Sequence, residues 1–485
     1  MATSFSRRSN GPADWRGFAV CGVIIALFLY LRCFRLFSAF LPQIDEISLL
    51  NQANVPFLAG GSFSSTYFPL SVVTKYLLQF LGLGNLRLLT VLSQLIGIAC
   101  LAAVVRSRLS PAAGAAFALL TTFHWYFNYI GRLYDVSSFT LFFFGVHIFF
   151  LARWYSARTI LSLFFAVAAA AIGLDNYPGP WIYYLPFSAA VILAVSFKAR
   201  EIRGQILPAA GVFGVCALPF LYVLFHTDSS RDWSYLTQFS GTAQPLFPTF
   251  NNPQPFFRTF VETFTYHSPE PPGVLQAAIA VILAAAPAVL FLRGRAGSPI
   301  VSLAFGGYIF QIALIAISPV VPNHTGHFSI VLLFFFFLSA ACLNFKPARI
   351  AGTLCFAAAA VFGVRDFAIR FAGEDQRKLA LTALEQAENA GPGAILISDG
   401  AYLKFLWIDA VPAERKLMVV NCDKPDPFTP AALAPYTILF LTTECENFLT
   451  SGEFEQVWRV EQLIEAHSAH GMSYYRRIEK PDYRP

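Results

Sequence analysis

Two adjacent carboxylates, Asp45 and Glu46 in the stretch LPQIDEISLL, directly follow the first long apolar segment of the chain. Carboxylates are costly near hydrocarbon, and those that occur there tend to mark functional sites. Neighbouring residues point about 100° apart on a helix and to opposite faces of a strand, so these two side chains cannot do the same work. One suits a general base and the other an orienting or metal-binding role. The alternative is an interfacial pair, solvated by water or held by Arg32 and Arg35.

A second cluster, Arg132-Leu133-Tyr134-Asp135, follows the aromatic stretch HWYFNYI. An arginine offers a fixed fork of donors that suits a phosphate, and a tyrosine offers a hydroxyl and a flat face for a sugar or a lipid. The cluster therefore predicts a phosphate or lipid contact at Arg132 and Tyr134. Its alternative is an aromatic belt residue beside an arginine that extends its charge to the membrane surface.

A third cluster holds two histidines, His324 and His327, in the stretch PNHTGH. With Asp45 or Glu46 they could bind a divalent metal cation, although the other ligands would have to come from distant segments. Phosphate contact or interfacial hydrogen bonding fits these histidines better. His124 and His147 lie within apolar segments, where packing or hydrogen bonding to neighbouring helices is expected. Weaker substrate-binding candidates are Asp175, Asn176, Arg231 and His267.

The composition determines the solvent in which these clusters must work. Hydrophobic residues make up 56% of the chain and charged residues only 13%, with a mean hydropathy of +0.56. Such a chain would expose too much apolar surface to water, which excludes a soluble globular protein. Residues 1–372 carry 23 Lys and Arg against 11 Asp and Glu. The basic excess therefore belongs to the membrane part, and no nucleic-acid partner is expected.

Apolar segments predict about eleven transmembrane helices, each close to the length that a bilayer core requires. They lie near residues 17–38, 86–105, 111–128, 136–152, 159–174, 179–197, 206–225, 273–292, 299–318, 327–345 and 350–369.

The distribution of basic residues predicts which ends of these segments face the cytoplasm. If the N-terminus is cytoplasmic, the inner side collects 14 basic residues against only Asp14 and Glu201, as the positive-inside rule expects. The basic residues are Arg7, Arg8, Arg16, Arg106, Arg108, Arg153, Arg158, Lys198, Arg200, Arg203, Arg293, Arg295, Lys346 and Arg349. Asp45 and Glu46 then face the outer side, and an odd number of retained spans puts the C-terminal domain there too.

Two long outer loops and a polar tail complete the predicted organisation. The loop 39–85 contains SVVTKYLLQFLGL, whose spacing predicts an amphipathic juxtamembrane helix over 71–83, and the loop 226–272 is rich in proline and aromatic residues. In the tail 373–485, a helical stretch alternates with the apolar runs AILIS, KLMVV and YTILFLTT, which predicts a small extracytoplasmic α/β domain. A lid or docking module fits it best, and Cys422 and Cys445 could form a disulfide there.

Three stretches carry a resemblance to a known family. They are FPLSVVTKYLLQFLGLGNLRLLTVLSQLIGIACLAAVVRSRL, FHWYFNYIGRLYDVSSFTLFFFGVHIFFLARWY and VVPNHTGHFSIVLLFFFFLSAA. With the outer Asp-Glu pair, residues 15 to 345 resemble the multi-spanning GT-C glycosyltransferases, in the branch of protein O-mannosyltransferases and aminoarabinose (lipid A) transferases. The chain departs from that pattern at Tyr67-Phe68-Pro69-Leu70, where relatives often have Lys-Pro-Pro-Leu. It departs again at His324 to His327, where an Arg-Tyr pair is common.

The resemblance implies a sugar donor linked to a polyprenyl phosphate, attacked on the outer face of the bilayer with inversion by a lipid, glycan or protein acceptor. Asp45 is then the general base, and Glu46 orients it or binds a metal with Asp45 and His324. No cofactor other than such a divalent cation is expected. Donor phosphate or lipid contacts are expected from Arg132, Tyr134, Lys75, Tyr67, His324 and His327.

Two other classes of membrane protein remain open. A lipid-linked glycan flippase or transporter would need polar groups along a path inside the spans, whereas the acidic residues cluster at the outer edge. An O-antigen polymerase or ligase would rely on outer arginine and histidine rather than on a carboxylate after the first span. In either case the composition of the spans favours a bacterial inner membrane.

Overall fold

A computed structural model describes residues 15–34, 36, 68–221, 253–267, 271–292, 299–317 and 325–371, and five strands between residues 394 and 477. For residues 68–84 it describes chiefly the backbone. The chain divides into two compact units, of which one holds most of the helices and the other holds the strands.

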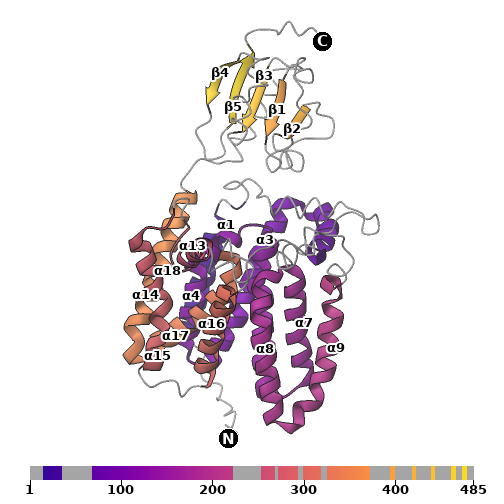
Figure 1. Ribbon diagram of the computed structural model, residues 1–485, viewed down its shortest axis with the longest axis vertical. Coiled ribbons are helices and arrows are strands. Elements are labelled where there is room, and N and C mark those ends of the chain that lie inside the picture. Colours follow the sequence, from indigo (N-terminus) through magenta and orange to yellow (C-terminus); the bar gives the residue numbers. More distant parts are fainter. Residues whose placement is uncertain are drawn as a thin grey trace. The chain divides into compact units, whose positions relative to one another are not determined.

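Apolar helices make up nearly all of the first unit, and α7, α8 and α9 stand side by side in it (Figure 1). In chain order the helices are α1 (Trp15–Cys33), α3 (Phe68–Arg108), α4 (Pro111–Phe123), α5 (Trp125–Ile130), η2 (Val136–Phe139), α6 (Thr140–Ala157), α7 (Ile160–Asn176), α8 (Pro178–Lys198), η3 (Arg200–Gln205), α9 (Ile206–Cys216), α13 (Gln254–Phe264), α14 (Val274–Ala285), η4 (Ala286–Ala288), α15 (Val289–Leu292), α16 (Pro299–Ile317), η5 (Thr325–Phe328), α17 (Ser329–Asn344), η6 (Lys346–Ala348) and α18 (Arg349–Phe371).

Length and composition identify the helices that can cross a bilayer. Six in the described part are long and apolar enough: Asn85–Arg108, Val136–Ala157, Pro178–Lys198, Pro299–Ile317, Thr325–Asn344 and Lys346–Ile369. Four shorter apolar helices accompany them: Ala19–Cys33, Pro111–Phe123, Ile160–Asn176 and Val274–Ala288. The chain is therefore an integral multi-pass membrane protein. Each of the eleven predicted segments overlaps a helix, and the number of crossings stays a prediction.

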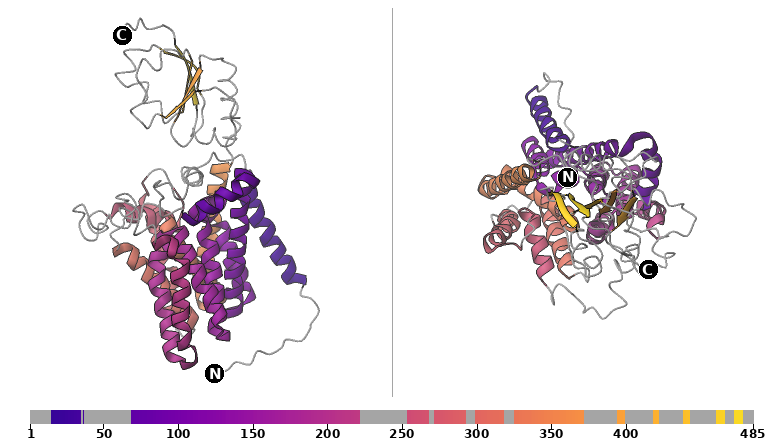
Figure 2. Two further views of the ribbon diagram at one scale, coloured as in Figure 1. Left: turned by 90° about the vertical axis from the view of Figure 1, so that its right-hand side faces the viewer. Right: turned by 90° about the horizontal axis from the view of Figure 1, so that it is seen from above.

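Short connections reverse the chain and give the bundle two ends (Figure 1, Figure 2). We name them after the arginines at their turns. The Arg158 end contains the ends of α3, α6, α8 and α17 and the starts of the helices that follow them. The Arg132 end contains the end of α1, the turn between α5 and α6, the turn between α7 and α8, and η5.

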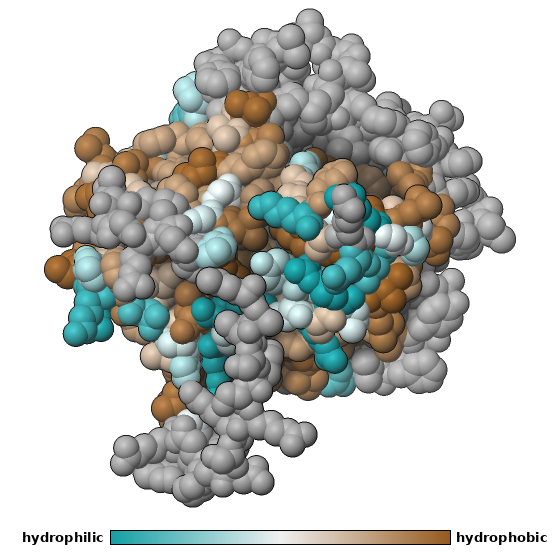
Figure 3. All heavy atoms as spheres, turned by 90° about the horizontal axis from the view of Figure 1, so that it is seen from below, coloured by the Kyte–Doolittle hydropathy of each residue, from teal (hydrophilic) through white to brown (hydrophobic). Residues whose placement is uncertain are grey.

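The predicted inner basic residues lie together at the Arg158 end. Those whose side chains the structure describes are Arg106, Arg108, Arg153, Arg158, Lys198, Arg203, Lys346 and Arg349. Figure 3 views this end and shows hydrophilic residues gathered on it, with apolar residues around them. The charge pattern of the sequence thus corresponds to one face of the folded bundle.

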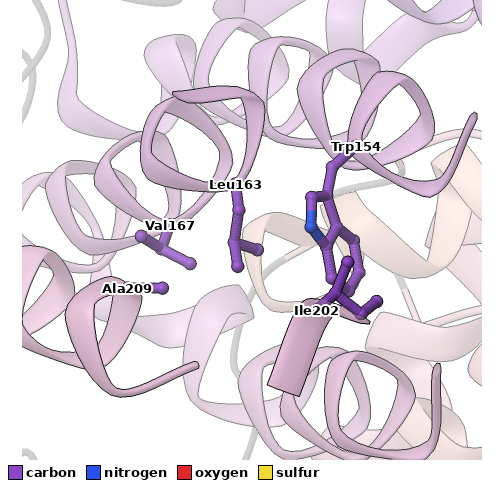
Figure 4. Close-up of a cluster of buried hydrophobic side chains, with 5 residues drawn as sticks. All are labelled: Trp154, Leu163, Val167, Ile202 and Ala209. Atoms are coloured by element: carbon purple, nitrogen blue, oxygen red, sulfur yellow. The ribbon is translucent and has the colours of Figure 1, made fainter. Parts of the chain in front are cut away.

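Under this face lies an apolar cluster of buried side chains from α6, α7, η3 and α9 (Figure 4). Its members are Trp154, Leu163, Val167, Ile202 and Ala209. The indole nitrogen of Trp154 donates to the side-chain oxygen of Gln205 at 2.9 Å, and the Gln205 amide nitrogen donates to the Arg158 carbonyl at 2.9 Å. Arg158 ends α6 in the left-handed conformation, with φ 58°, so this chain of bonds holds a tight turn.

Helix α3 differs from the sequence prediction in its extent. The stretch 71–83 is helical as predicted, but it is continuous with the predicted span 86–105 in one helix of 41 residues. No proline follows Pro69 within α3, so every later residue keeps the amide that the helix requires. Within the predicted loop 226–272 the structure also contains α13, a helix that the sequence analysis did not predict.

The second unit contains one mixed sheet in the order β2-β1-β3-β5-β4. Its strands are β1 (Ala394–Ser398), β2 (Met418–Asn421), β3 (Ile438–Thr442), β4 (Val460–Glu465) and β5 (Met472–Arg477). Strand β1 pairs in parallel with β2 and β3, whereas β5 is antiparallel to both β3 and β4. The three predicted apolar runs are thus confirmed as strands. The predicted helix over 377–390 and the pair Cys422 and Cys445 lie outside the described residues.

Candidate functional site

A buried cation lies at the end of α1. Arg32 is 0% exposed, and its Nη1 donates to Asn128 Oδ1 at 2.6 Å and to the Thr122 carbonyl at 3.3 Å. Its Nε donates to Gln94 Oε1 at 3.4 Å. All three acceptors are neutral, and Nη2 has no hydrogen-bond partner within the described residues. Because burying an unbalanced charge is costly, this guanidinium creates a strong demand for a nearby anion.

Arg132 binds the end of the same helix. Its Nη1 donates to the Leu31 carbonyl at 3.1 Å, and its Nη2 donates to the Phe34 carbonyl. The last carbonyls of a helix have no partner within it, and a cation there also interacts favourably with the helix dipole. The predicted arginine cluster therefore holds the point from which the chain continues toward Asp45.

The absence of a side chain at Gly131 makes this arrangement fit. A Cβ atom at Gly131 would lie 2.3 Å from Gln94 Oε1 and 2.6 Å from Arg32 Nε. Gln94 is oriented in turn by a hydrogen bond of 3.3 Å from its Nε2 to the Ser138 carbonyl. The polar side chains of α1 and α3 thus pack directly on the backbone beside Arg132.

The turn that carries Arg132 is closed and buried. The Ser138 hydroxyl donates to the Ile130 carbonyl at 2.6 Å and to the Leu133 carbonyl at 3.0 Å. Tyr134 is 0% exposed, and its ring packs edge-on against Phe139 with centroids 5.8 Å apart. The ring of Tyr134 therefore helps to fix the turn from inside.

Asp175 and Asn176 reach the same end from α7. The Phe220 amide donates to Asp175 Oδ1 at 3.0 Å, and Asn176 Nδ2 donates to the Val136 carbonyl at 2.6 Å. Both side chains are buried. Each side chain thus holds a backbone position beside the site, and contact with a substrate stays a prediction for both.

His327 lies against the start of α8. It is buried in η5, with its ring centroid 6.4 Å from that of Tyr177 and 6.5 Å from that of Tyr183. A Cβ at Gly179 would lie 3.1 Å from its Nδ1. The fold therefore brings His327 to the end of the bundle where Arg132, Tyr134, Asp175 and Asn176 lie.

Helix α13 is attached to this end by two ring nitrogens, one from Trp125 at the start of α5 and one from His124, the N-cap of α5. His124 Nε2 lies 3.1 Å from the Thr263 carbonyl, and Trp125 Nε1 donates to the Glu262 carbonyl at 3.0 Å. Glu262 binds His267 Nδ1 at 2.9 Å and Arg258 Nε at 2.9 Å. Burial raises the pKa of the Glu262 carboxyl, but the hydrogen bonds from His267 and Arg258 outweigh it and lower that pKa overall.

The expectation for the histidines inside apolar segments is confirmed. His147 Nδ1 lies 2.8 Å from the Ala166 carbonyl, and its Nε2 lies 2.9 Å from the Tyr184 hydroxyl and 3.2 Å from Ser188 Oγ. His124 binds the end of α13, as described above. Both histidines join neighbouring helices.

Several predicted site residues lie outside the described residues. These are Asp45, Glu46, Tyr67, Arg231 and His324. Lys75 lies in α3, of which only the backbone is described there. Among the side chains that the structure does describe, no three His, Cys, Asp or Glu residues group as metal ligands.

The sequence analysis considered Arg32 only as a partner for Asp45 and Glu46. A charged residue inside the predicted span 17–38 was the available signal, because charges in spans usually mark function. Its acceptors Gln94 and Asn128 are 62 and 96 residues away along the chain, so no local pattern could assign them.

Comparisons with known proteins bear on the fold. No family model matches the chain, and no curated protein matches it. The crystal structure of the Archaeoglobus fulgidus oligosaccharyltransferase in the apo form is similar with a TM-score of 0.53 and 12% identity, over 98% of this chain and 76% of that one.

Two crystal structures of ArnT from Cupriavidus metallidurans also match at 12% identity. The one bound to undecaprenyl phosphate has a TM-score of 0.47, over 98% of this chain and 100% of that one. The apo structure has a TM-score of 0.45, over 96% of this chain and 98% of that one. The likeness to the oligosaccharyltransferase bears on the fold alone: the helical membrane part of this chain has a GT-C-like fold.

Proposed function

We propose that this chain is a membrane glycosyltransferase that moves a sugar from a polyprenyl-phosphate donor to an acceptor hydroxyl at the Arg132 end. Asp45 is its general base, and Glu46 orients that base or binds a metal. The acceptor is a lipid, a glycan or a protein. The Arg132 end and the C-terminal domain face the extracytoplasmic side of a bacterial inner membrane, with the N-terminus in the cytoplasm.

The observation that carries the proposal is the cationic end of α1 within a GT-C fold. Arg32 is buried there among neutral acceptors, and Arg132 binds the last carbonyls of the helix. Asp45 follows Phe34 by 11 residues in the chain. The proposal therefore combines the cations at this helix end with a catalytic carboxylate that is close to them in the sequence.

The chemistry needs few groups. The acceptor oxygen attacks the anomeric carbon from the face opposite the phosphate and gives its proton to Asp45. The bond between the anomeric carbon and the phosphate oxygen breaks, so polyprenyl phosphate leaves and the configuration inverts. Fixed cations stabilise the negative charge that grows on this leaving group. Arg32 is placed to contribute such a charge, while Arg132 keeps the helix end in position.

The test measures release of polyprenyl phosphate from polyprenyl-phosphate hexoses and pentoses by mass spectrometry, in membranes that contain the full chain. We expect Asp45→Asn to lower the rate about 10²- to 10⁴-fold, the usual contribution of a general base. Glu201→Gln, an exposed carboxylate of the Arg158 end, is the matched control and should keep the rate. Full activity of Asp45→Asn would refute the base, and a wild-type chain that releases nothing from any donor would refute the transferase.

The same variants separate the alternatives. A flippase would move the lipid-linked sugar across a reconstituted bilayer without breaking the glycosidic bond. An O-antigen polymerase or ligase would tolerate Asp45→Asn but lose activity on replacement of Arg132. Among the polar side chains of the described spans, His147 is held by hydrogen bonds to α7 and α8. Arg32 and Gln94 are hydrogen-bonded to each other at the Arg132 end, so this end carries the buried polar groups on which the transferase proposal depends.

A further inference from the structure

Two arginines of the Arg158 end share one tyrosine ring. The guanidinium carbon of Arg158 lies 5.1 Å from the ring centroid of Tyr155, and that of Arg108 lies 5.8 Å from it. Arg108 comes from the end of α3, whereas Tyr155 and Arg158 come from the end of α6. We refer to Arg108, Tyr155 and Arg158 as the Tyr155 cluster. Stacking holds both planar cations beside one aromatic ring.

The charge of this cluster is not balanced by any described carboxylate. Arg108 Nη2 donates to the Ala152 carbonyl at 3.1 Å and to the Ser156 hydroxyl at 2.6 Å, both of which are neutral. Arg158 Nη1 is buried without a hydrogen-bond partner among the described residues. The cluster therefore holds two positive charges at this end of the bundle, with no described carboxylate beside them.

An exposed apolar strip on α7 begins beside these charges. Leu161 is 60% exposed and Phe165 is 48% exposed, and they lie one turn apart on the same face of the helix. The ring of Phe165 packs on that of Phe150 with centroids 4.9 Å apart. Figure 3 shows hydrophilic residues bordered by apolar ones at this end of the bundle.

We propose that the Tyr155 cluster binds the headgroup of an anionic phospholipid, with an acyl chain of the same lipid along Leu161 and Phe165. The arginine forks match the oxygens of a phosphodiester, and the tyrosine ring suits the interface between headgroup and hydrocarbon. A free phosphate would use the cations but not the apolar strip. The combination therefore favours a lipid, and this site does not depend on the transferase activity.

The test measures lipid binding to the purified full chain by native mass spectrometry, with dioleoyl phosphatidylglycerol as the probe. A basic residue that contacts an anionic headgroup contributes about fivefold in affinity. We therefore expect the double variant R108Q/R158Q to bind phosphatidylglycerol about 25-fold more weakly than wild type. Y155A, which keeps both charges and loses the stacking, should bind it about two- to fivefold more weakly.

Arg203 provides the matched control. It lies at the same end, but the ring on which it stacks is Phe197, with its guanidinium carbon 5.9 Å from that ring centroid. R203Q should keep wild-type affinity. Equal binding of dioleoyl phosphatidylcholine and phosphatidylglycerol would overturn the proposal, as would competition by inorganic phosphate at the lipid concentration. If the double variant does not fold, unchanged binding by Y155A would overturn it instead.

Discussion

Both ends of the bundle carry arginines, but the arginine side chains are more deeply buried at the Arg132 end than at the Arg158 end. At the Arg132 end, Arg32 and Arg132 are 0% exposed and donate to carbonyl and amide oxygens. At the Arg158 end, Arg203 is exposed and Arg108 is half-buried, and each stacks on an aromatic ring. Beneath those charges the core is apolar, with Trp154 packed among aliphatic side chains.

The difference shows which charges report on function. An exposed arginine keeps its hydration, so its position costs little and mainly reflects the side of the membrane. A buried arginine must be compensated by many precisely placed acceptors, and it persists only where its charge or its hydrogen bonds are needed. An exposed arginine therefore indicates the side of the membrane, whereas a buried arginine indicates a functional or structural need for its charge.

Replacing the buried Arg32 should lower the rate of sugar transfer more than replacing a surface arginine does. We expect Arg32→Gln to lower sugar transfer about 10²- to 10³-fold, because one fixed charge that stabilises a leaving group is worth that much. The loss of its donors also leaves Asn128 and Gln94 with fewer partners, at about 1–3 kcal/mol of stability. Transfer rates in membranes and thermal unfolding in detergent measure the two effects.

The comparison requires a surface variant and a variant that keeps the charge. Arg203→Gln, at the Arg158 end, should change neither rate nor unfolding temperature, because that side chain is exposed. Arg32→Lys keeps the positive charge but loses the fork, so it should recover part of the rate. If Arg32→Gln and Arg32→Lys unfolded at the same lowered temperature and transferred sugar at the wild-type rate, Arg32 would be a structural residue only.

Smaller effects, on stability, are expected from adding one methyl group at Gly131 of the Arg132 end and at Gly211 of α9. Gly131→Ala would place a carbon 2.3 Å from Gln94 Oε1 and 2.6 Å from Arg32 Nε, so it should destabilise the fold by about 1–3 kcal/mol. Gly211→Ala lies within α9, where a Cβ meets nothing within 4 Å, and should stabilise the helix by about 0.5–1 kcal/mol. Thermal unfolding should thus shift in opposite directions, and a downward shift for both variants would contradict the close packing at Gly131.

The helices of this bundle could be predicted because membrane spans follow from local composition. A long apolar run in lipid must satisfy its own backbone, so each predicted segment became a helix without knowledge of its neighbours. The shared end of Arg108, Arg158 and Arg349 followed from charge counting for the same reason. The continuity of α3 was missed because the polar residues at its start predicted a separate interfacial helix, although nothing there interrupts the hydrogen bonds.

The candidate site could be predicted only in part. The stretch around Arg132 was identified from residue types, but the use of Arg132 to hold α1 depends on Leu31, about 100 residues earlier in the chain. The attachment of α13 likewise depends on His124 and Trp125, which bind its carbonyls from another segment. Long-range hydrogen bonds of this kind leave no periodic pattern in one sequence. Asp45 stays a prediction because it lies outside the described residues.

The smallest expected effect concerns pH and the attachment of α13 at the Arg132 end. Burial alone would raise the pKa of Glu262, but the hydrogen bonds from His267 and Arg258 lower it below the ordinary value of 4.5. The ionised carboxylate therefore favours the folded state. This stabilisation is complete above the ordinary pKa, where the carboxyl is ionised in both states, and it is lost as the pH falls through the lower folded pKa.

Glu262→Gln removes this titration while keeping the shape of the side chain. We expect the wild type to unfold at a higher temperature than Glu262→Gln at about pH 5.5, and the difference to shrink as the pH falls toward about 3.5. Glu201→Gln at the Arg158 end should show no such change, because Glu201 is exposed and lies far from α13 in the chain. A constant difference across this pH range would mean that Glu262 acts through packing rather than through its charge, and the attachment of α13 would then depend on Trp125 and His124.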